Sequence, residues 1–133
     1  MARSKRVKPE ELPQVVGEIL KTYAQDLDAG TDTVVTKVAK VGVEALKSAS
    51  QATFKGNKYW RSWSYQVERK RIGTRCVIYS TMPGLPHLLE NGHASVHGGR
   101  VGKPVPGRTH IAPVAEMLDM EYVRQMEAMI SDL

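Results

Sequence analysis

The sequence has little of several features that define common classes of protein. Among its 133 residues there is one cysteine, Cys76, so a disulfide framework is excluded and a secreted setting is not favoured. No apolar run is long enough to cross a bilayer, and no apolar stretch follows the basic start of the chain. We therefore expect neither a membrane partner nor a signal peptide. There is only one phenylalanine, so the tryptophans and tyrosines are needed for the core.

The composition that remains is that of one globular domain. Hydrophobic residues make up 41% of the chain and charged residues 25%, which excludes a disordered protein. A chain of this length can bury enough surface to form a core without staples. We expect a single domain over residues 1–133, with residues 1–8 as a flexible basic arm.

The net charge of +5 is unevenly distributed. Residues 55–75 carry seven basic side chains against one acid, Glu68, and residues 91–110 carry three basic side chains and no acid. Residues 111–133 reverse the sign, with five acids against Arg124. A basic middle and an acidic end favour contact with nucleic acid or with another copy of the same protein.

Helical periodicity covers the first third of the chain. Apolar residues recur at steps of three and four in two stripes, which predicts an amphipathic helix or a pair of helices. The first stripe is Leu12, Val15, Val16, Ile19, Leu20, Tyr23 and Leu27; the second is Val34, Val38, Val41 and Ala45. Gly30 lies between the stripes, and the sequence leaves open whether it ends one helix or kinks a long one.

The period changes after residue 60. Trp63, Tyr65 and Val67 alternate with polar residues, which is typical of a half-buried strand. A polar turn around Gly73 and a β-branched run over residues 75–80 complete a predicted antiparallel hairpin. The aromatic residues of this hairpin favour core packing over a platform for stacking bases.

Two further segments complete an α+β fold class. Residues 91–107 hold five glycines and two prolines without periodicity, so we expect a long loop over residues 91–108, which is usually functional or disordered. Pro113 can then begin a C-terminal helix, which we expect to pack on the sheet. Four of the six methionines lie in this helix, and methionine suits irregular contact surfaces.

The loop and its flanks do not assemble a catalytic centre. His87, His93 and His97 could hold a metal together with Glu90, but glycines on both sides argue against the helix that their spacing would need. Cys76 falls within a strand, where an inert thiol is the rule, and no serine lies in a nucleophile motif. We expect no enzyme, no metal and no cofactor.

Nucleic-acid binding is the alternative that the charge supports. Arg69, Lys70 and Arg71 would face DNA at the turn of the hairpin. Such contacts with phosphates would be independent of base sequence. The sequence alone supports a basic α+β domain with a long, functional loop.

Four blocks of residues, in this order and spacing, resemble a known family. They are Gly56 to Trp63 (GNKYWRSW), Leu85 to His93 (LPHLLENGH), Gly98 to Val101 (GGRV) and Arg108 to Pro113 (RTHIAP). The chain is similar over about residues 30–133 to the neck or tail-component proteins of long-tailed bacteriophages, the family named for gene product ten of phage HK-ninety-seven. Val114 between Pro113 and Ala115 is a small departure from that pattern.

The resemblance implies a structural virion protein of the head–tail connector or of tail completion, assembled in the host cytoplasm as a ring. Its partners would be other copies, portal, adaptor or head-completion proteins, and tail-terminator or tail-tube proteins, with nonspecific contact to packaged DNA. In this interpretation His87 and Glu90 anchor the loop. The contacts with neighbouring subunits or partners would come from His93, His97, Arg100, Lys103, Arg108, Met117 and Met120.

Overall fold

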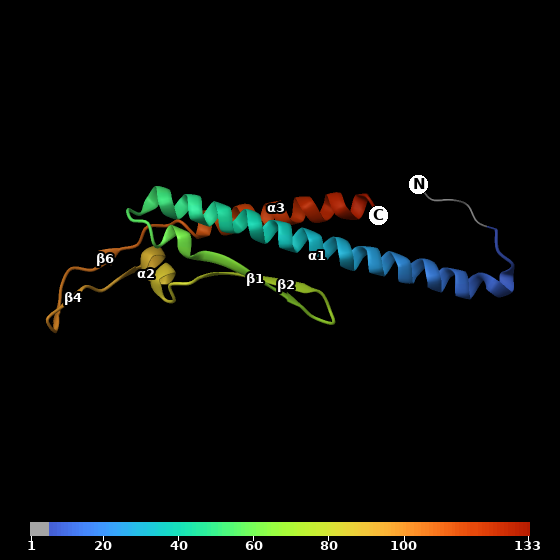
Figure 1. Cartoon of the computed structure of the whole chain (residues 1–133), viewed down its shortest axis with the longest axis horizontal. Helices are drawn as coiled ribbons and strands as arrows, with labels where there is room; N and C mark the ends of the chain where they lie inside the picture. Colours follow the sequence, from blue (N-terminus) through green and yellow to red (C-terminus); the bar gives the residue numbers. More distant parts are fainter. Residues whose placement is uncertain (1–5) are drawn as a thin grey trace.

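The computed structural model describes the backbone of residues 6–133 and the side chains of residues 6–95 and 98–133. Its elements confirm the α+β class. Two long helices lie side by side, and a hairpin and a second, thinner projection extend from them (Figure 1). In chain order the elements are η1 (Pro9–Glu11), α1 (Leu12–Thr53), η2 (Trp60–Ser62), β1 (Trp63–Arg69), β2 (Thr74–Ser80), α2 (Leu85–Asn91), β3 (Gly92–His93), β4 (Val96–His97), β5 (Arg100–Val101), β6 (Val105–Pro106) and α3 (Ala112–Ser131).

The first third of the chain is one helix of 42 residues, which settles the choice between one helix and two. Gly30 lies within α1 and does not end or break the helix. Its lack of a side chain instead allows α3 to come close. A Cβ atom at Gly30 would come within 2.5 Å of the sulfur of Met129, which belongs to α3. At Gly42 a Cβ would come within 2.6 Å of Leu118, also in α3, and 2.7 Å of Ile78 in β2. The two glycines thus let α3 approach the backbone of α1.

The C-terminal helix packs chiefly along α1 and also meets the hairpin. Val114 and Gln125 are the buried residues of α3. Leu118 and Tyr122 share a hollow with Cys76 and Ile78 of β2 and with Val35, Val38 and Ala39 of α1.

The hairpin forms as predicted. β1 and β2 pair antiparallel from Trp63 opposite Ser80 to Arg69 opposite Thr74, and the turn contains Gly73 with a φ of 85°. Its far end is tied to the middle of α1. Asp32 accepts hydrogen bonds from the Arg69 guanidinium at 3.1 Å and from the Thr74 hydroxyl at 2.9 Å.

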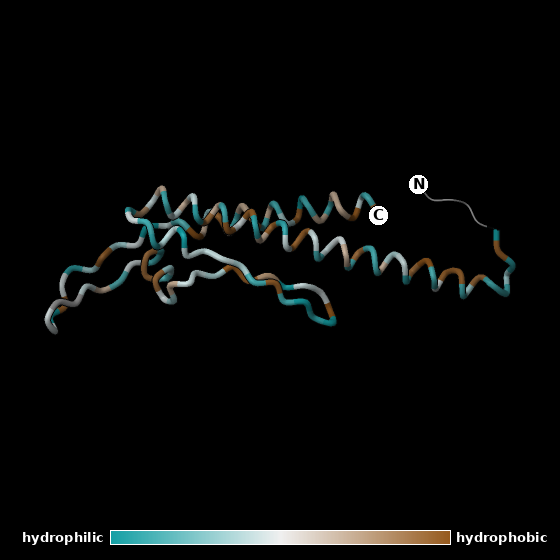
Figure 2. Tube along the Cα trace, in the orientation of Figure 1, coloured by the Kyte–Doolittle hydropathy of each residue, from teal (hydrophilic) through white to brown (hydrophobic). Residues whose placement is uncertain are grey.

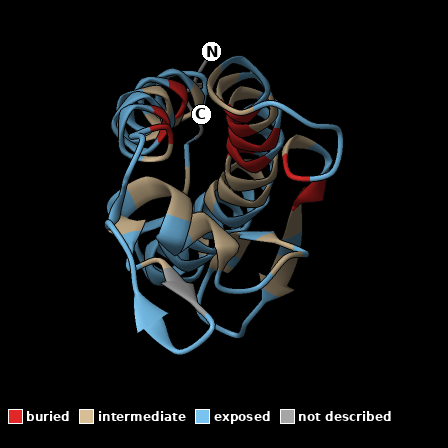
Figure 3. Cartoon of the chain, turned by 90° about the vertical axis from the view of Figure 1, so that its left-hand side faces the viewer, coloured by how far each residue is buried: buried red, intermediate tan, exposed pale blue. Residues whose placement is uncertain are grey.

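The core lies at the end of the molecule where α1 stops and α3 starts. Buried residues occur on the two long helices and between η2 and β1 (Figure 3). The Trp63 indole donates to the buried Ser50 hydroxyl at 2.8 Å. The rings of Phe54, Tyr59 and Trp63 meet edge to face, so these aromatic residues build the core.

The other end of α1 extends beyond everything else in the described structure (Figure 1). We call residues 12–27 the free segment, because none of its residues is buried. Hydrophobic residues recur along it without a covering element (Figure 2). Among the described residues, no helix is both long and apolar enough to cross a membrane.

Candidate functional site

The predicted loop is an extended, paired arm. β3 pairs antiparallel with β6, and β4 pairs with β5 beyond them, with Gly98 and Gly99 at the turn. We call residues 92–107 the arm. The segment predicted as an extended loop over residues 91–108 thus contains two short ladders. Ladders of two residues are too short to leave a periodicity in a sequence.

Glu90 holds the base of the arm to the start of α3. Its Oε1 accepts the backbone N–H groups of His110 at 2.6 Å and Ile111 at 2.9 Å, and its Oε2 accepts that of Ala112 at 3.0 Å. These N–H groups have no partner within the helix, so the carboxylate satisfies them and its charge suits the positive end of the helix. Burial raises the pKa of Glu90, but the three donors outweigh burial and hold it below its ordinary value.

His110 joins Glu90 to the core. Its side chain is fully buried, with Nδ1 2.8 Å from the Arg108 carbonyl oxygen and 3.0 Å from Glu90 Oε1. Both neighbours only accept, so Nδ1 carries a proton, and Nε2 then accepts the Tyr59 hydroxyl at 2.6 Å. Burial first, and then the charge of Glu90, raise the pKa of Tyr59 to about 12, so the phenol keeps its proton. We call Tyr59, Glu90 and His110 the clamp.

Where the arm begins and ends, next to the clamp, the two backbone segments lie so close together that only glycine fits at two positions. Gly92 has a φ of 87°, and a Cβ atom there would lie 2.6 Å from the carbonyl oxygen of Val105. On the facing strand, a Cβ at Gly107 would overlap the carbonyl oxygen of Glu90. The two strands are therefore closely packed where the arm leaves the body, whereas residues 98–107 of the arm are exposed.

The two predicted anchors differ in what they hold. Glu90 binds across to α3, whereas His87 is exposed in α2 and contacts only its neighbour one turn on, with the Asn91 amide 3.0 Å from Nδ1. Arg108, expected to contact another subunit, braces its own chain. Its guanidinium donates to the Thr53 carbonyl at the end of α1, 3.2 Å away, and its N–H donates to the Leu89 carbonyl at 2.8 Å.

The arm presents the remaining predicted contacts to solvent. His93, Arg100 and Lys103 are exposed, and Val101 between the two cations is 78% exposed. The side chain of His97 lies outside the described residues. The arm thus offers basic and apolar groups together, away from the core.

The tip of the hairpin separates the three basic residues that were expected to face DNA. Arg69 is engaged with Asp32, and the hydrogen bonds from Thr74 and then Arg69 lower the pKa of Asp32. Lys70 and Arg71 are exposed, next to Ile72, which is 92% exposed. We call residues 70–72 the hairpin tip; its two cations are available to a partner.

The outer face of α3 carries the two predicted methionine contacts. Met117 is half-exposed and Met120 is 75% exposed, with Val123 beside them and acids around them. Glu121 instead binds Arg124, and hydrogen bonds from Arg124 and then Gln125 lower the pKa of Glu121 to about 2. We call Met117, Met120 and Val123, with Glu116, Asp119 and Glu127, the outer face.

The sequence raises the question of two other kinds of site among the described residues, a metal site and a reactive thiol. Within the described part of the chain, no three histidine, cysteine, aspartate or glutamate side chains form a group that could hold a metal ion. Cys76 lies half-buried in β2, where burial raises the pKa of its thiol and so disfavours the reactive thiolate.

Sequence reasoning missed His110, Tyr59 and Asp32 as structural centres. His110 and Tyr59 are 51 residues apart, and Asp32 is 42 residues from Thr74, so spacing gives no signal. The one available signal was that both Tyr59 and His110 fall inside the blocks that carry the family resemblance.

Comparisons of the chain with protein-family models, with curated proteins and with solved structures find no match.

Proposed function

We propose that this chain is a structural virion protein of a tailed bacteriophage, part of the head–tail connector or of the completed tail, which assembles as a ring. The observation that carries the proposal is the clamp. It brings together residues from three separate blocks of the family resemblance: Tyr59, Glu90 and His110. These residues have one common effect, which is to mount a projecting arm on the pair of helices. Such a projection suits contact between subunits.

A ring needs two different surfaces that fit each other, because a heterologous contact repeats around the assembly. The acidic, methionine-bearing outer face and the basic hairpin tip are such a pair. Each combines an exposed apolar side chain, Met120 or Ile72, with a majority of charges of one sign. On the outer face the one cation, Arg124, is paired with Glu121. Opposite charges steer such surfaces together and fix their register.

The arm supplies a third surface, for proteins above or below the ring. Its exposed His93, Arg100 and Lys103 and its apolar Val101 would meet a portal, adaptor or head-completion protein, or a tail-terminator or tail-tube protein. In this proposal the chain itself is assembled in the host cytoplasm and becomes part of the virion. No catalytic role is part of the proposal.

A second function, binding of nucleic acid, is favoured by one observation: Lys70 and Arg71 are exposed at a projecting tip. Contacts of these cations with phosphates would not read the base sequence. The two functions differ in what the tip binds. In the ring it binds the outer face of the next copy, and in the alternative it binds phosphate.

Charge reversal distinguishes them. We expect K70E/R71E to abolish rings seen by electron microscopy and by light scattering, and D119K/E127K to do the same. Mixing the two variants should restore mixed assemblies, because each supplies the surface that the other has lost. Duplex binding that disappears in K70E/R71E, together with unchanged assembly, would instead establish the nucleic-acid alternative.

A further inference from the structure

The free segment carries a row of large apolar side chains that nothing in its own chain covers. Ile19 and Leu20 are each 62% exposed, and Leu12, Val16 and Tyr23 are each between 44% and 49% exposed. A contiguous apolar row of this kind marks a contact site. A helical segment of this length is also only marginally stable in water without packing. The free segment therefore needs an occupant.

The row continues the line along which α3 packs on α1. Its members follow one another at helical steps of three and four, and the last two positions face α3: Leu12, Val16, Ile19, Tyr23, Leu27, Gly30 and Val34. α3 runs antiparallel to α1 and ends beside Gly30, and the free segment extends past that end (Figure 1).

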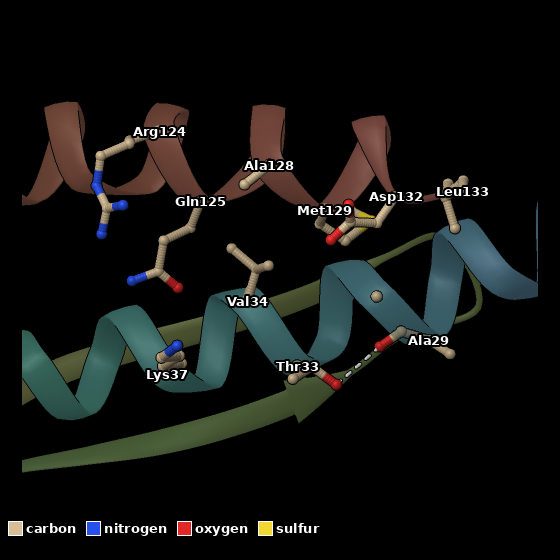
Figure 4. Close-up of a pocket in the computed structure, with 11 residues that line it drawn as sticks. Ala29, Thr33, Val34, Lys37, Arg124, Gln125, Ala128, Met129, Asp132 and Leu133 are labelled. Atoms are coloured by element: carbon tan, nitrogen blue, oxygen red, sulfur yellow. Dashed lines mark hydrogen bonds between the residues drawn. The ribbon is translucent and has the colours of Figure 1, made fainter.

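The seam between the two helices is open at this end. An open groove there is lined by Ala29, Gly30 and Val34 of α1, and by Met129 and Leu133 near the end of α3 (Figure 4). A second helix, laid antiparallel on the free segment, would take up the line where α3 stops. It would cover the row and close the groove.

The charged residues of the free segment indicate what kind of helix could cover the row. With 3.6 residues per turn, Lys21 and Asp28 fall on the side of α1 away from the row. Glu18 and Asp26 lie along one edge of the row, where they line a hollow together with Ile19 and Tyr23. The row itself carries no charged side chain. It fits an apolar helical face of the same length, and the free segment of another copy has that face.

We propose that the occupant is a second copy of this chain, with the two free segments paired antiparallel about a two-fold axis near Ile19 and Leu20. In this register Leu12 lies opposite Leu27 of the second copy, and Val16 lies opposite Tyr23. Each copy then fills the open line of the other, as a self-complementary two-fold contact requires.

The spacing of the row favours the antiparallel direction. Its apolar residues are symmetric about the axis, because the steps from Leu12 to Val16 to Ile19 are four and three residues, and the steps from Leu20 to Tyr23 to Leu27 are three and four. An antiparallel pair therefore places each of these side chains opposite another apolar one. The same direction is that of α3, which lies antiparallel on α1 and ends beside Gly30.

The pairing goes beyond the proposed function and does not depend on it, because it uses neither the hairpin tip nor the outer face. Loss of the pairing would leave the ring contact intact. A failure of the ring would likewise leave the pairing intact.

Cysteine cross-linking tests the geometry. In a C76S background, we expect I19C to form a covalent dimer on mild oxidation, because it lies beside the axis. L12C is the matched control and should form no covalent dimer, because its two sulfur atoms would be about 22 Å apart along the pair at 1.5 Å per residue. Linking by both variants would show a parallel pair and overturn the proposed direction.

Sedimentation over a concentration series tests the occupant. In the K70E/R71E background, which removes the proposed ring contact, we expect a dimer, and we expect I19E to raise its dissociation constant at least about tenfold, since the change lies at the centre of the contact in both copies. Q25E, on the opposite side of the helix, should leave the dissociation constant unchanged. The proposal is overturned by a K70E/R71E protein that is monomeric throughout, or by a dimer that I19E does not weaken. The first result would assign the row to another protein.

Discussion

The two halves of α1 each carry apolar residues at helical spacing, but they differ in what covers these residues. Over residues 34–50, α3 and the hairpin bury Val34, Val38, Val43 and Leu46. Over residues 12–27, the same periodicity leaves Ile19 and Leu20 mostly exposed. The difference shows that an amphipathic stripe predicts that a helix needs cover. It does not predict whether that cover comes from the same chain.

The largest expected effect comes from the same truncation made in each half. L46A removes a side chain that is 5% exposed and should lower the free energy of unfolding by about 2–5 kcal/mol. L20A, at a concentration where the chain is monomeric, should change it by less than about 0.5 kcal/mol. Urea titration measures both. Equal losses would mean that the free segment is packed within the monomer.

The clamp should show an intermediate effect, because it secures the packed half where α3 begins. E90A leaves the N–H groups of His110, Ile111 and Ala112 without their acceptor and should cost about 2 kcal/mol. L88A, at a half-exposed position in the same short helix, is a surface control with a smaller expected loss. Thermal unfolding at neutral pH compares the two variants.

The clamp also predicts a dependence on pH. The pKa of Glu90 is lower folded than unfolded, so its stabilisation is present above the ordinary carboxyl pKa. It is lost as the pH falls through the lower, folded pKa. Asp32 and Glu121 share this sign, so E90Q is the control that isolates one group. We expect E90Q to lose less stability than the wild type on acidification, and an identical pH profile would contradict this account of the clamp.

The smallest effect concerns two glycines of α1, one in each half. G17A should favour the helix by up to about 1 kcal/mol, because a Cβ there meets nothing within 4 Å. G30A should gain less or lose about 1 kcal/mol, because its Cβ would come within 2.5 Å of the Met129 sulfur, which must move. Circular dichroism during thermal unfolding measures both. A larger gain for G30A than for G17A would mean that α3 does not pack closely at Gly30.

Much of the fold follows from local pattern. Steps of three and four residues predict the long helix, and alternation from Trp63 to Val67 predicts the hairpin. The role of Gly30 did not follow, because a glycine that breaks a helix and one that admits a neighbouring helix look the same in a sequence. The extent to which α3 packs along α1 as well as on the hairpin is also a tertiary feature that the stripe of α3 does not encode.

Less of the candidate site than of the fold could be predicted from the sequence. The position of Glu90 before a glycine-rich segment predicts an anchor for the loop. The groups that it binds, however, are backbone N–H groups at the start of α3, about 20 residues later in the chain. His110 was noticed only as part of a family block, and the short ladders of the arm have no period. The predicted contact residues Arg69 and Arg108 also bind Asp32 and the Thr53 carbonyl within the chain, and the sequence gives no sign of these bonds. Contacts between residues so far apart need the folded chain.

The central claim is that the two halves of α1 differ in the source of their cover, and hydrogen exchange of the α1 amides at two protein concentrations tests it most directly. We predict that residues 34–50 are protected at both concentrations. Residues 12–27 should be protected only at the concentration where the chain is a dimer. Protection of residues 12–27 that does not change on dilution through the dimer's dissociation would contradict the claim, as would exchange of both halves at the same rate.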